Sequence, residues 1–339
     1  MSKRSKKIDF LKGIAIILVV FAHSIQFSSG HYFFEKNLYF ENSIFKIIYS
    51  FHMPLFMIIS GYLFYYSVAK NNFWKNVHNR VMKNLVPIIA WSVIPITINL
   101  LSLDAYSTYN IAKAIVAGVV YNLWFLWAVL LCSIVVLLCN KFFKDSIIIY
   151  ILLFIVSLFI PNILNFNLYV FMFPYFVFGY LYNKSSREID KNINWKIIIF
   201  GLLFIYMLSY YNYDCYIYNT GTYILNNFNY QIFIDVYRYL IGFVGSVFII
   251  LLVIKFFERI PNKIRNLIAM IGERSFIIYI ITDYLFAYVI KEITYSFSGV
   301  NYLLCIIGTI ILIIMSNIVY MLLKKIKLTN VLLLGNRSK

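Results

Sequence analysis

The chain has 339 residues, of which 62% are hydrophobic and 13% charged, and its formal net charge is +17. A soluble domain of this length has too little polar surface to cover so much apolar side chain, so the composition predicts an all-α, polytopic membrane protein. A membrane β-barrel is excluded, because barrel strands alternate apolar and polar residues and the apolar runs here are continuous. The positive charge lies in short segments between those runs, which indicates membrane orientation rather than nucleic-acid binding.

About ten apolar runs approach the length of about 20 residues that a helix needs to cross a bilayer. The first run contains Lys12 and His23 and is not closed by a small-residue cleavage site, so we expect a retained helix rather than a cleaved leader. We expect a single transmembrane domain over residues 1–339, without an appended soluble domain. The expected helices are 8–27, 44–66, 84–103, 115–140, 146–160, 168–183, 197–211, 233–257, 270–290 and 300–323.

Lysines and arginines are unequally divided between the two sides that these helices define. With the N-terminus in the cytoplasm, 23 of them fall in cytoplasmic segments and 5 in outside segments. Because cytoplasmic loops of membrane proteins are rich in these residues, the bias predicts that both termini are cytoplasmic.

Three ionisable residues, Asp9, Lys12 and His23, interrupt the first apolar run. Ionisable groups inside a spanning helix are costly and mark functional sites by default. Lys12 and His23 are eleven positions apart, about three helical turns, so they lie on one face of the helix. The alternatives are that Lys12 extends its ammonium to the inner headgroups, and that His23 is a structural histidine hydrogen-bonded across helices.

A second intramembrane histidine, His52, lies in the run FHMPLF at residues 51–56. Counted from the outer helix ends, His52 lies about 12 Å and His23 about 6 Å below the outer surface. The similar depths and the short connection between the two helices predict that both imidazoles share one cavity. Pro54 frees a backbone carbonyl beside this position and is expected to bend the helix.

Further polar candidates lie on the cytoplasmic side and in the ninth helix. Arg80 and Lys83 are three positions apart on an expected amphipathic turn, so we expect them to face the same way and to bind phosphates. The alternative is ordinary cytoplasmic loop charge. Asp283, near the middle of the ninth expected helix, is a candidate cavity residue because a mid-membrane carboxylate is neutral, paired or hydrated.

Motifs of several other enzyme classes are absent from the sequence: G-x-S-x-G, a Walker loop and H-E-x-x-H do not occur. The cysteines show neither a zinc-site spacing nor a disulfide framework, so no metal is expected. These four residues are Cys132, Cys139, Cys215 and Cys305.

At its polar residues the chain resembles the membrane acyltransferase-3 family, especially its bacterial fucose 4-O-acetylase-like members. The resemblance implies a multi-pass enzyme of the bacterial plasma membrane. It also implies transfer of an acyl group, usually acetyl, from cytoplasmic acetyl-CoA to a hydroxyl of a cell-surface or lipid-linked glycan. The matching segments are IDFLKG at 8–13 leading to His23, FHMPLFMIISGYL at 51–63, RVMK at 80–83 before Pro87, LWFL at 123–126, and residues 272–279.

Two positions depart from the family pattern. The second basic pair is usually Arg-x-x-Arg, whereas this chain has Arg80 and Lys83, and a lysine cannot bind a phosphate through two parallel hydrogen bonds. Many relatives carry a histidine where this chain has Thr282. The resemblance implies that Arg80 and Lys83 hold the phosphates of CoA.

We expect His23 to act as the general base that deprotonates the sugar hydroxyl. Lys12, oriented by Asp9, would guide the donor or stabilise negative charge, and His52 would orient the acceptor. A covalent acyl-histidine route stays open. The rival function is a transporter or flippase for a glycan or lipid-linked sugar, which favours internal repeats that this sequence does not show. A structural or sensory subunit would leave the two histidines without a role.

Overall fold

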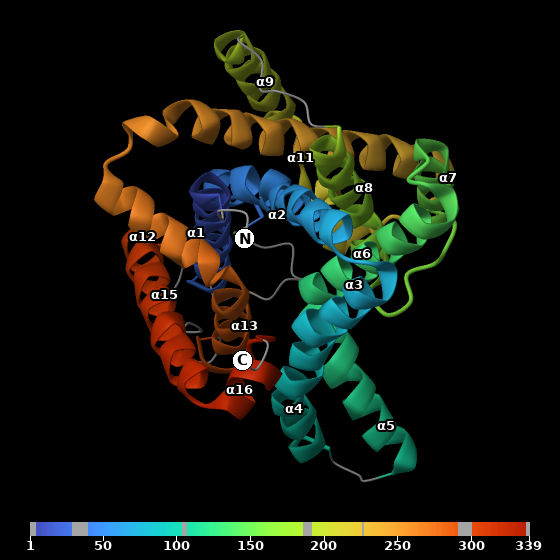
Figure 1. Cartoon of the computed structure of the whole chain (residues 1–339), viewed down its shortest axis with the longest axis vertical. Coiled ribbons are helices and arrows are strands. Elements are labelled where there is room, and N and C mark those ends of the chain that lie inside the picture. The colour runs from blue at the N-terminus through green and yellow to red at the C-terminus, as the bar shows by residue number, and fades with distance from the viewer. Residues whose placement is uncertain are drawn as a thin grey trace. The chain divides into compact units, whose positions relative to one another are not determined.

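The protein is described by a computed structural model, which covers residues 5–28, 40–103, 107–185, 192–225, 227–290 and 300–336. Every regular element in these ranges is a helix, as the composition predicts (Figure 1). The chain forms two compact units. The first unit comprises Met1–Ile59, Ser186–Thr220 and Asn229–Tyr320, and the second comprises Ser60–Ser185, Gly221–Phe228 and Met321–Lys339.

Helices of the first unit bear the candidate histidines. They are α1 (Lys6–Ser28), the first half of α2 (Ser43–Lys70), α9 (Ile193–Leu208), η3 (Tyr213–Cys215), α10 (Ile217–Thr220), α11 (Phe228–Phe256), η4 (Phe257–Arg259), α12 (Asn262–Glu273), α13 (Ser275–Leu285), η5 (Phe286–Ile290) and most of α15 (Tyr302–Lys325).

Helices of the second unit bear the candidate basic pair. Besides the second half of α2, they are α3 (Phe73–Arg80), η1 (Val81–Leu85), α4 (Val86–Leu101), α5 (Thr108–Val116), η2 (Ala117–Tyr121), α6 (Trp124–Phe143), α7 (Ile147–Ser157), α8 (Phe166–Lys184) and α16 (Lys327–Leu332).

Several helices are long and apolar enough to cross a membrane, which confirms the polytopic class. Six stretches of the described chain qualify: Lys6–Phe27, Ser43–Lys70, Phe73–Leu101, Trp124–Phe143, Phe228–Arg259 and Tyr302–Lys325. Three shorter apolar helices accompany them at Ile147–Ser157, Ile193–Leu208 and Ser275–Val289. The count of about ten spans and the cytoplasmic termini stay predictions. Eight residues used in the charge bias lie outside the described residues: Lys3, Arg4, Lys36, Arg187, Lys191, Lys291, Arg337 and Lys339.

The expected single helix over 115–140 is wrong. The chain instead forms α5 and η2, turns at Asn122 and Leu123, and begins α6 at Trp124. Leu123 has φ 52°, in the left-handed region, which a continuous right-handed helix does not contain. The indole of Trp127 donates a hydrogen bond of 3.0 Å to the carbonyl of Val119, so the start of α6 is tied to the end of η2.

The expected helix over 270–290 is also divided. α12 ends at Glu273 and α13 begins at Ser275, so the two helices meet at Arg274. The guanidinium of Arg274 donates to Asn317 Oδ1 at 2.8 Å and lies 5.0 Å from the ring centroid of Tyr320, both on α15. The break therefore turns a cation toward a neighbouring helix.

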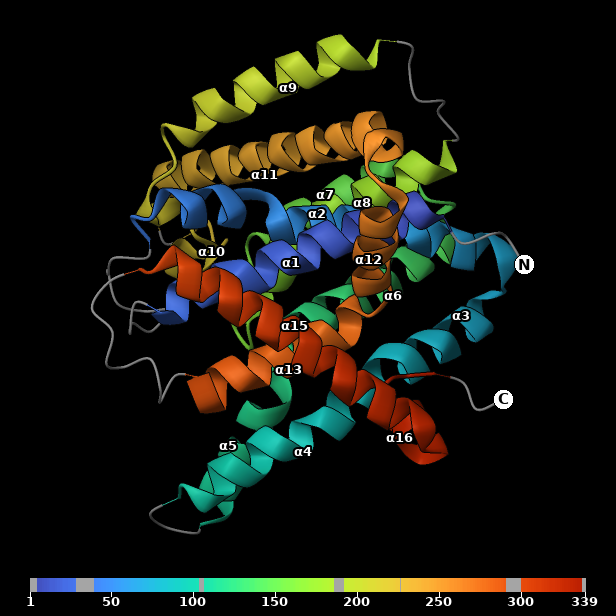
Figure 2. The ribbon, with the colours of Figure 1, turned by 90° about the vertical axis from the view of Figure 1, so that its left-hand side faces the viewer.

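α1 and α12 cross near the N-terminal end of α1 (Figure 2). A glycine of each helix lies where the two are in contact. A Cβ added to Gly13 would lie 2.0 Å from the carbonyl oxygen of Ile268, and one added to Gly272 would lie 1.8 Å from the carbonyl oxygen of Asp9. Neither position has room for a methyl group, so the close approach of the two helices requires glycine at both.

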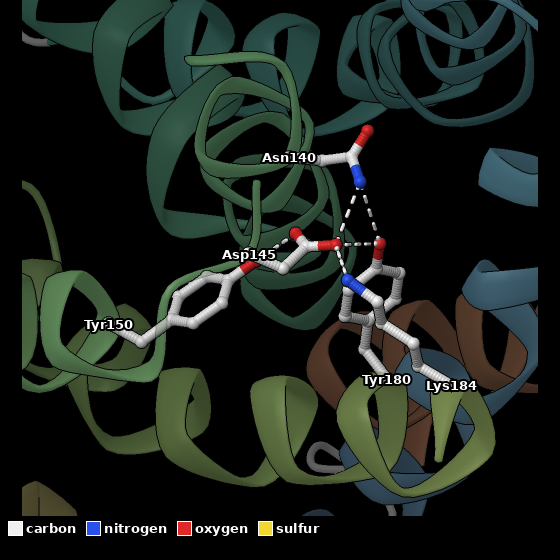
Figure 3. Close-up of polar contacts among 5 residues, drawn as sticks. All are labelled: Asn140, Asp145, Tyr150, Tyr180 and Lys184. Atoms are coloured by element: carbon white, nitrogen blue, oxygen red, sulfur yellow. Dashed lines mark hydrogen bonds and ion pairs between the residues drawn. The ribbon is translucent and has the colours of Figure 1, made fainter. Parts of the chain in front are cut away.

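A buried carboxylate joins α6, α7 and α8 in the second unit (Figure 3). Asp145 Oδ1 accepts a hydrogen bond of 2.8 Å from the Tyr150 hydroxyl. Asp145 Oδ2 accepts from Asn140 at 2.7 Å, from Tyr180 at 2.9 Å and from Lys184 at 2.7 Å. Burial alone would raise the pKa of Asp145, but the hydrogen bonds from Lys184, Asn140, Tyr150 and Tyr180 outweigh it and lower the pKa below its ordinary value.

Candidate active site

α1 carries Asp9, Lys12 and His23 on one uninterrupted helix, as the sequence predicts. Asp9 is buried, with 5% of its surface exposed, near the crossing with α12. A cavity of about 440 Å³ opens beside it at this end of α1. Its lining residues are Lys6, Asp9, Asn266, Ala269, Met270 and Glu273.

His23 lies among aromatic rings near the other end of α1. Its ring centroid is 5.7 Å from that of Phe286 in η5 and 6.2 Å from that of Tyr49 in α2. Phe27, one turn further along α1, stacks on Phe286 at 5.0 Å. Nδ1 of His23 lies 3.2 Å from Oε1 of Gln26. The histidine thus contacts the Gln26 amide and lies beside the rings of Tyr49 and Phe286.

His52 lies beside the same ring of Tyr49, with centroids 4.7 Å apart. It is 2% exposed, and its Nδ1 donates a hydrogen bond of 2.8 Å to the carbonyl of Ile48. Tyr49 therefore contacts both imidazoles, one from each of two helices. The structure brings His23 and His52 together, as their expected depths in the membrane predict.

The hydrogen bonds of the two histidines select the same tautomer. A backbone carbonyl only accepts, so Nδ1 of His52 carries its proton. With Gln26 Oε1 as the acceptor, Nδ1 of His23 carries a proton as well. In the neutral ring the other nitrogen, Nε2, then has a lone pair. An imidazole in this tautomer acts as a base or a nucleophile through Nε2.

α11 fixes the backbone that carries His52. The hydroxyl of Ser246 donates to the carbonyl of Phe51 at 3.2 Å, and a Cβ added to Gly245 would lie 2.8 Å from the Phe51 side chain. The hydrogen bond and the close approach are both adjacent to the histidine in sequence. They hold α2 against α11 close to Pro54, where an intrahelical hydrogen bond is missing.

The sequence reasoning missed a buried ion pair on α11. Arg238 bonds Asp235 Oδ1 one turn away, and Gln231 donates to the same oxygen at 3.2 Å. Arg238 also donates to Thr220 Oγ1 at 3.2 Å. Asp235 and Arg238 are only 4% and 2% exposed. Their i,i+3 spacing within an apolar run was the available signal.

Arg80 and Lys83 belong to the second unit, whereas the histidines belong to the first. Arg80 ends α3, with its guanidinium carbon 4.3 Å from the ring centroid of Phe64. Its buried Nε has no hydrogen-bond partner, and neither has the buried Nδ2 of Asn84. A guanidinium with an unused donor is suited to binding an anion.

The segment between Arg80 and α4 is not the amphipathic α-helical turn that the sequence predicts. Val81–Leu85 winds as a π-helix, in which the Val86 N–H reaches back to the carbonyl of Val81. Pro87 has no N–H to donate to the carbonyl of Lys83, so the ordinary i,i−4 hydrogen bond cannot form there. The spacing of Arg80 and Lys83 therefore does not place them on one face by α-helical geometry.

Asp283 lies on α13, three residues before the ring of Phe286 that contacts His23. The neighbouring Thr282 is 2% exposed, and its hydroxyl donates to the carbonyl of Ile278 at 2.7 Å. Thr282 thus bonds within its own helix, and Asp283 stays a predicted cavity residue. No group of three His, Cys, Asp or Glu side chains within the described ranges is placed to hold a metal.

Comparison with known proteins gives one family and two relatives. A family profile described as an acyltransferase domain matches residues 5–327. Nodulation protein NolL of Mesorhizobium japonicum (strain LMG 29417 / CECT 9101 / MAFF 303099) is 28% identical over 229 residues, covering 67% of this chain and 60% of the relative. Nodulation protein NolL of Sinorhizobium fredii (strain NBRC 101917 / NGR234) is 30% identical over 200 residues, covering 55% and 51%. The chain thus matches between half and two thirds of these relatives' lengths. No solved structure matches significantly.

Proposed function

Because the chain belongs to the acyltransferase 3 family, we propose that it moves an acetyl group from cytoplasmic acetyl-CoA to a hydroxyl of a cell-surface or lipid-linked glycan. The enzyme is a membrane acyltransferase of the all-α polytopic class. We also propose that it works in the bacterial plasma membrane. The observation that carries the proposal is the pair of histidines beside Tyr49, with Nδ1 of His23 next to Gln26 Oε1 and Nδ1 of His52 bonded to the carbonyl of Ile48.

The proposed chemistry centres on His23. Its Nε2 removes the proton of the acceptor hydroxyl as the oxygen attacks the thioester carbonyl. The carbon–sulfur bond then breaks, and the imidazolium returns its proton to the departing CoA thiolate. Gln26 holds the ring in the tautomer that this step needs. In the covalent alternative, Nε2 of His23 attacks the thioester carbonyl and expels the CoA thiolate. The sugar hydroxyl then takes the acetyl group from the histidine, and its proton leaves with the thiolate as the CoA thiol.

Lys12 and Asp9 are assigned to the donor. Eleven residues of helix separate Lys12 from His23, a rise of about 16 Å, so Lys12 cannot contact a carbonyl held at His23. We propose that Lys12 guides the donor along α1 and that Asp9, one turn before it, orients the ammonium. His52, whose ring packs against Tyr49, orients the acceptor hydroxyl.

Arg80 and Lys83 are assigned to the phosphates of CoA. The support is the unused Nε of Arg80, the unused Nδ2 of Asn84 and the interrupted helix that carries them. Buried donors without acceptors are costly, and a phosphate supplies several acceptor oxygens. π-helical turns occur frequently at functional sites.

The test is the acetyl ester content of the envelope glycan in strains that carry wild-type protein, His23→Gln or no protein. Acetate released by mild base should be abundant with wild type and should fall to the level of the empty strain with His23→Gln. The matched control is His78→Gln, because His78 is exposed on α3 and should be dispensable. Equal acetate in all strains would show that the chain does not acetylate this glycan, and would favour a transport role.

A further inference from the structure

The chain folds back on itself after α16. We call residues 333–336 the C-terminal hook. The N–H of Gly335 donates to the carbonyl of Val331 at 3.1 Å, and the N–H of Asn336 donates to the carbonyl of Asn330 at 3.1 Å. The Asn336 side chain also donates to Asn330 Oδ1 at 2.7 Å. Gly335 has φ +63°, a left-handed conformation that reverses the chain at this point.

The hook packs on the backbone of η1, within the second unit. A Cβ added to Gly335 would lie 2.9 Å from Cα and 2.9 Å from the carbonyl oxygen of Lys83, and 3.1 Å from the carbonyl oxygen of Met82. The Trp91 indole donates to the carbonyl of Leu333 at 2.9 Å, and Leu334 is 9% exposed. Two independent contacts, one with η1 and one with α4, thus hold the hook in place.

The segment that the hook contacts is η1, which carries one of the two residues proposed to bind the donor phosphates. η1 connects Arg80 to Asn84 and contains Lys83, and its π-helical winding is uncommon in proteins. Since Pro87 withholds one hydrogen bond from this turn, neighbouring chain has to help fix its shape. The hook supplies backbone contact directly at Lys83.

We propose that the C-terminal hook is a positioning element for the donor-phosphate site, and that Gly335 is its essential contact. The hook sets the path of the backbone at Lys83, and through it the directions of the Arg80 and Lys83 side chains. Any side chain at Gly335 pushes this backbone away, because the atoms it would meet are main-chain atoms that cannot rotate aside. This inference rests on the proposed function, since it presupposes that Arg80 and Lys83 bind the phosphates of CoA.

The test measures the binding of CoA to the purified full chain in detergent at several salt concentrations. Gly335→Ala should weaken CoA binding about tenfold and flatten its salt dependence, because phosphate contacts give affinity its salt dependence. A purely structural role would not change the salt slope. Gly221→Ala is the matched control: Gly221 has φ +65°, but its added Cβ would lie 3.4 Å from Asn167 Nδ2, an ordinary contact. It imposes the same backbone strain and should leave the salt slope of CoA binding unchanged.

Trp91→Phe provides a second variant should Gly335→Ala fail to fold. It removes the indole hydrogen bond to Leu333 and should weaken CoA binding severalfold in the same salt-dependent way. If Gly335→Ala and Trp91→Phe bind CoA like wild type while Arg80→Ala binds it more weakly, the proposed donor site stands and the hook has no part in it. If Arg80→Ala also binds CoA like wild type, the donor site is refuted and this inference with it.

Discussion

The carboxylate of Asp145 and the pair of histidines at Tyr49 differ in how their polar atoms are bonded. Four donors converge on the Asp145 carboxylate, and both of its oxygens are bonded. The histidines instead use Nδ1, His23 toward Gln26 and His52 toward the carbonyl of Ile48, and both rings lie beside the aromatic ring of Tyr49. The first cluster lies in the second unit and the pair in the first.

The difference indicates that the Asp145 cluster stabilises the fold and that the histidines serve catalysis. A fully bonded carboxylate fastens helices together and offers nothing to a substrate. An imidazole whose Nδ1 donates a hydrogen bond has a fixed tautomer, and in that tautomer Nε2 is the nitrogen that can accept a proton. Substitutions in the Asp145 cluster should therefore change stability, whereas substitutions at the pair should change acyl transfer.

The largest expected effect is that of His23→Gln on acyl transfer. Loss of a general base lowers rates by about 10²- to 10⁴-fold. The glutamine keeps a polar side chain of similar length, so thermal unfolding in detergent should shift little. Wild-type rates in His23→Gln would show that this histidine has no chemical role.

Asp145→Leu should have the next largest effect, and it should act on stability. The change leaves the hydroxyls of Tyr150 and Tyr180 and the ammonium of Lys184 without their acceptor, at a cost of about 2–4 kcal/mol. Thermal unfolding would report the loss, and transfer activity per folded molecule should persist. Tyr150→Phe, which removes a single donor, is the matched variant and should cost about 1 kcal/mol.

Gln26→Leu should lower activity about tenfold while leaving the fold intact. Without the amide oxygen, the His23 ring is free to carry its proton on either nitrogen, and part of the population presents the wrong tautomer. Steady-state rates and unfolding temperatures measured together would check this. A large loss of stability with unchanged activity per folded molecule would place Gln26 with the structural cluster instead.

The smallest expected effect is a pH dependence of stability that originates at Asp145. Its pKa in the folded protein is lowered, so its contribution is complete above the unfolded value of about 3.9 and is lost as the pH falls through the folded value. The unfolding temperature of wild type should therefore drop more steeply below about pH 4 than that of Asp145→Asn. Parallel curves for the two proteins would contradict this assignment.

The sequence predicted much of the fold, because long apolar runs with few charges specify spanning helices almost by themselves. The sequence did not predict the helix breaks at Leu123 and Arg274. They depend on a left-handed residue and on bonds between segments, Trp127 to Val119 and Arg274 to Asn317. Runs of apolar residues contain no signal for such bonds.

Some features of the candidate site could likewise be predicted from the sequence, and others could not. The meeting of His23 and His52 follows from counting residues along two adjacent helices. Their shared neighbour Tyr49, the ring of Phe286 and the ion pair of Asp235 with Arg238 depend on how distant segments pack. In a chain with 32 phenylalanines and 30 tyrosines, no single ring stands out before the fold is known.

The central claim is acetyl transfer at His23, and it is tested most directly with radiolabelled acetyl-CoA. Purified protein in vesicles would be supplied with this donor and with the glycolipid fraction of the envelope. Wild type should place base-labile label in the glycolipid, and His23→Gln should give only background. Equal labelling by both proteins, or none by wild type, would contradict the claim.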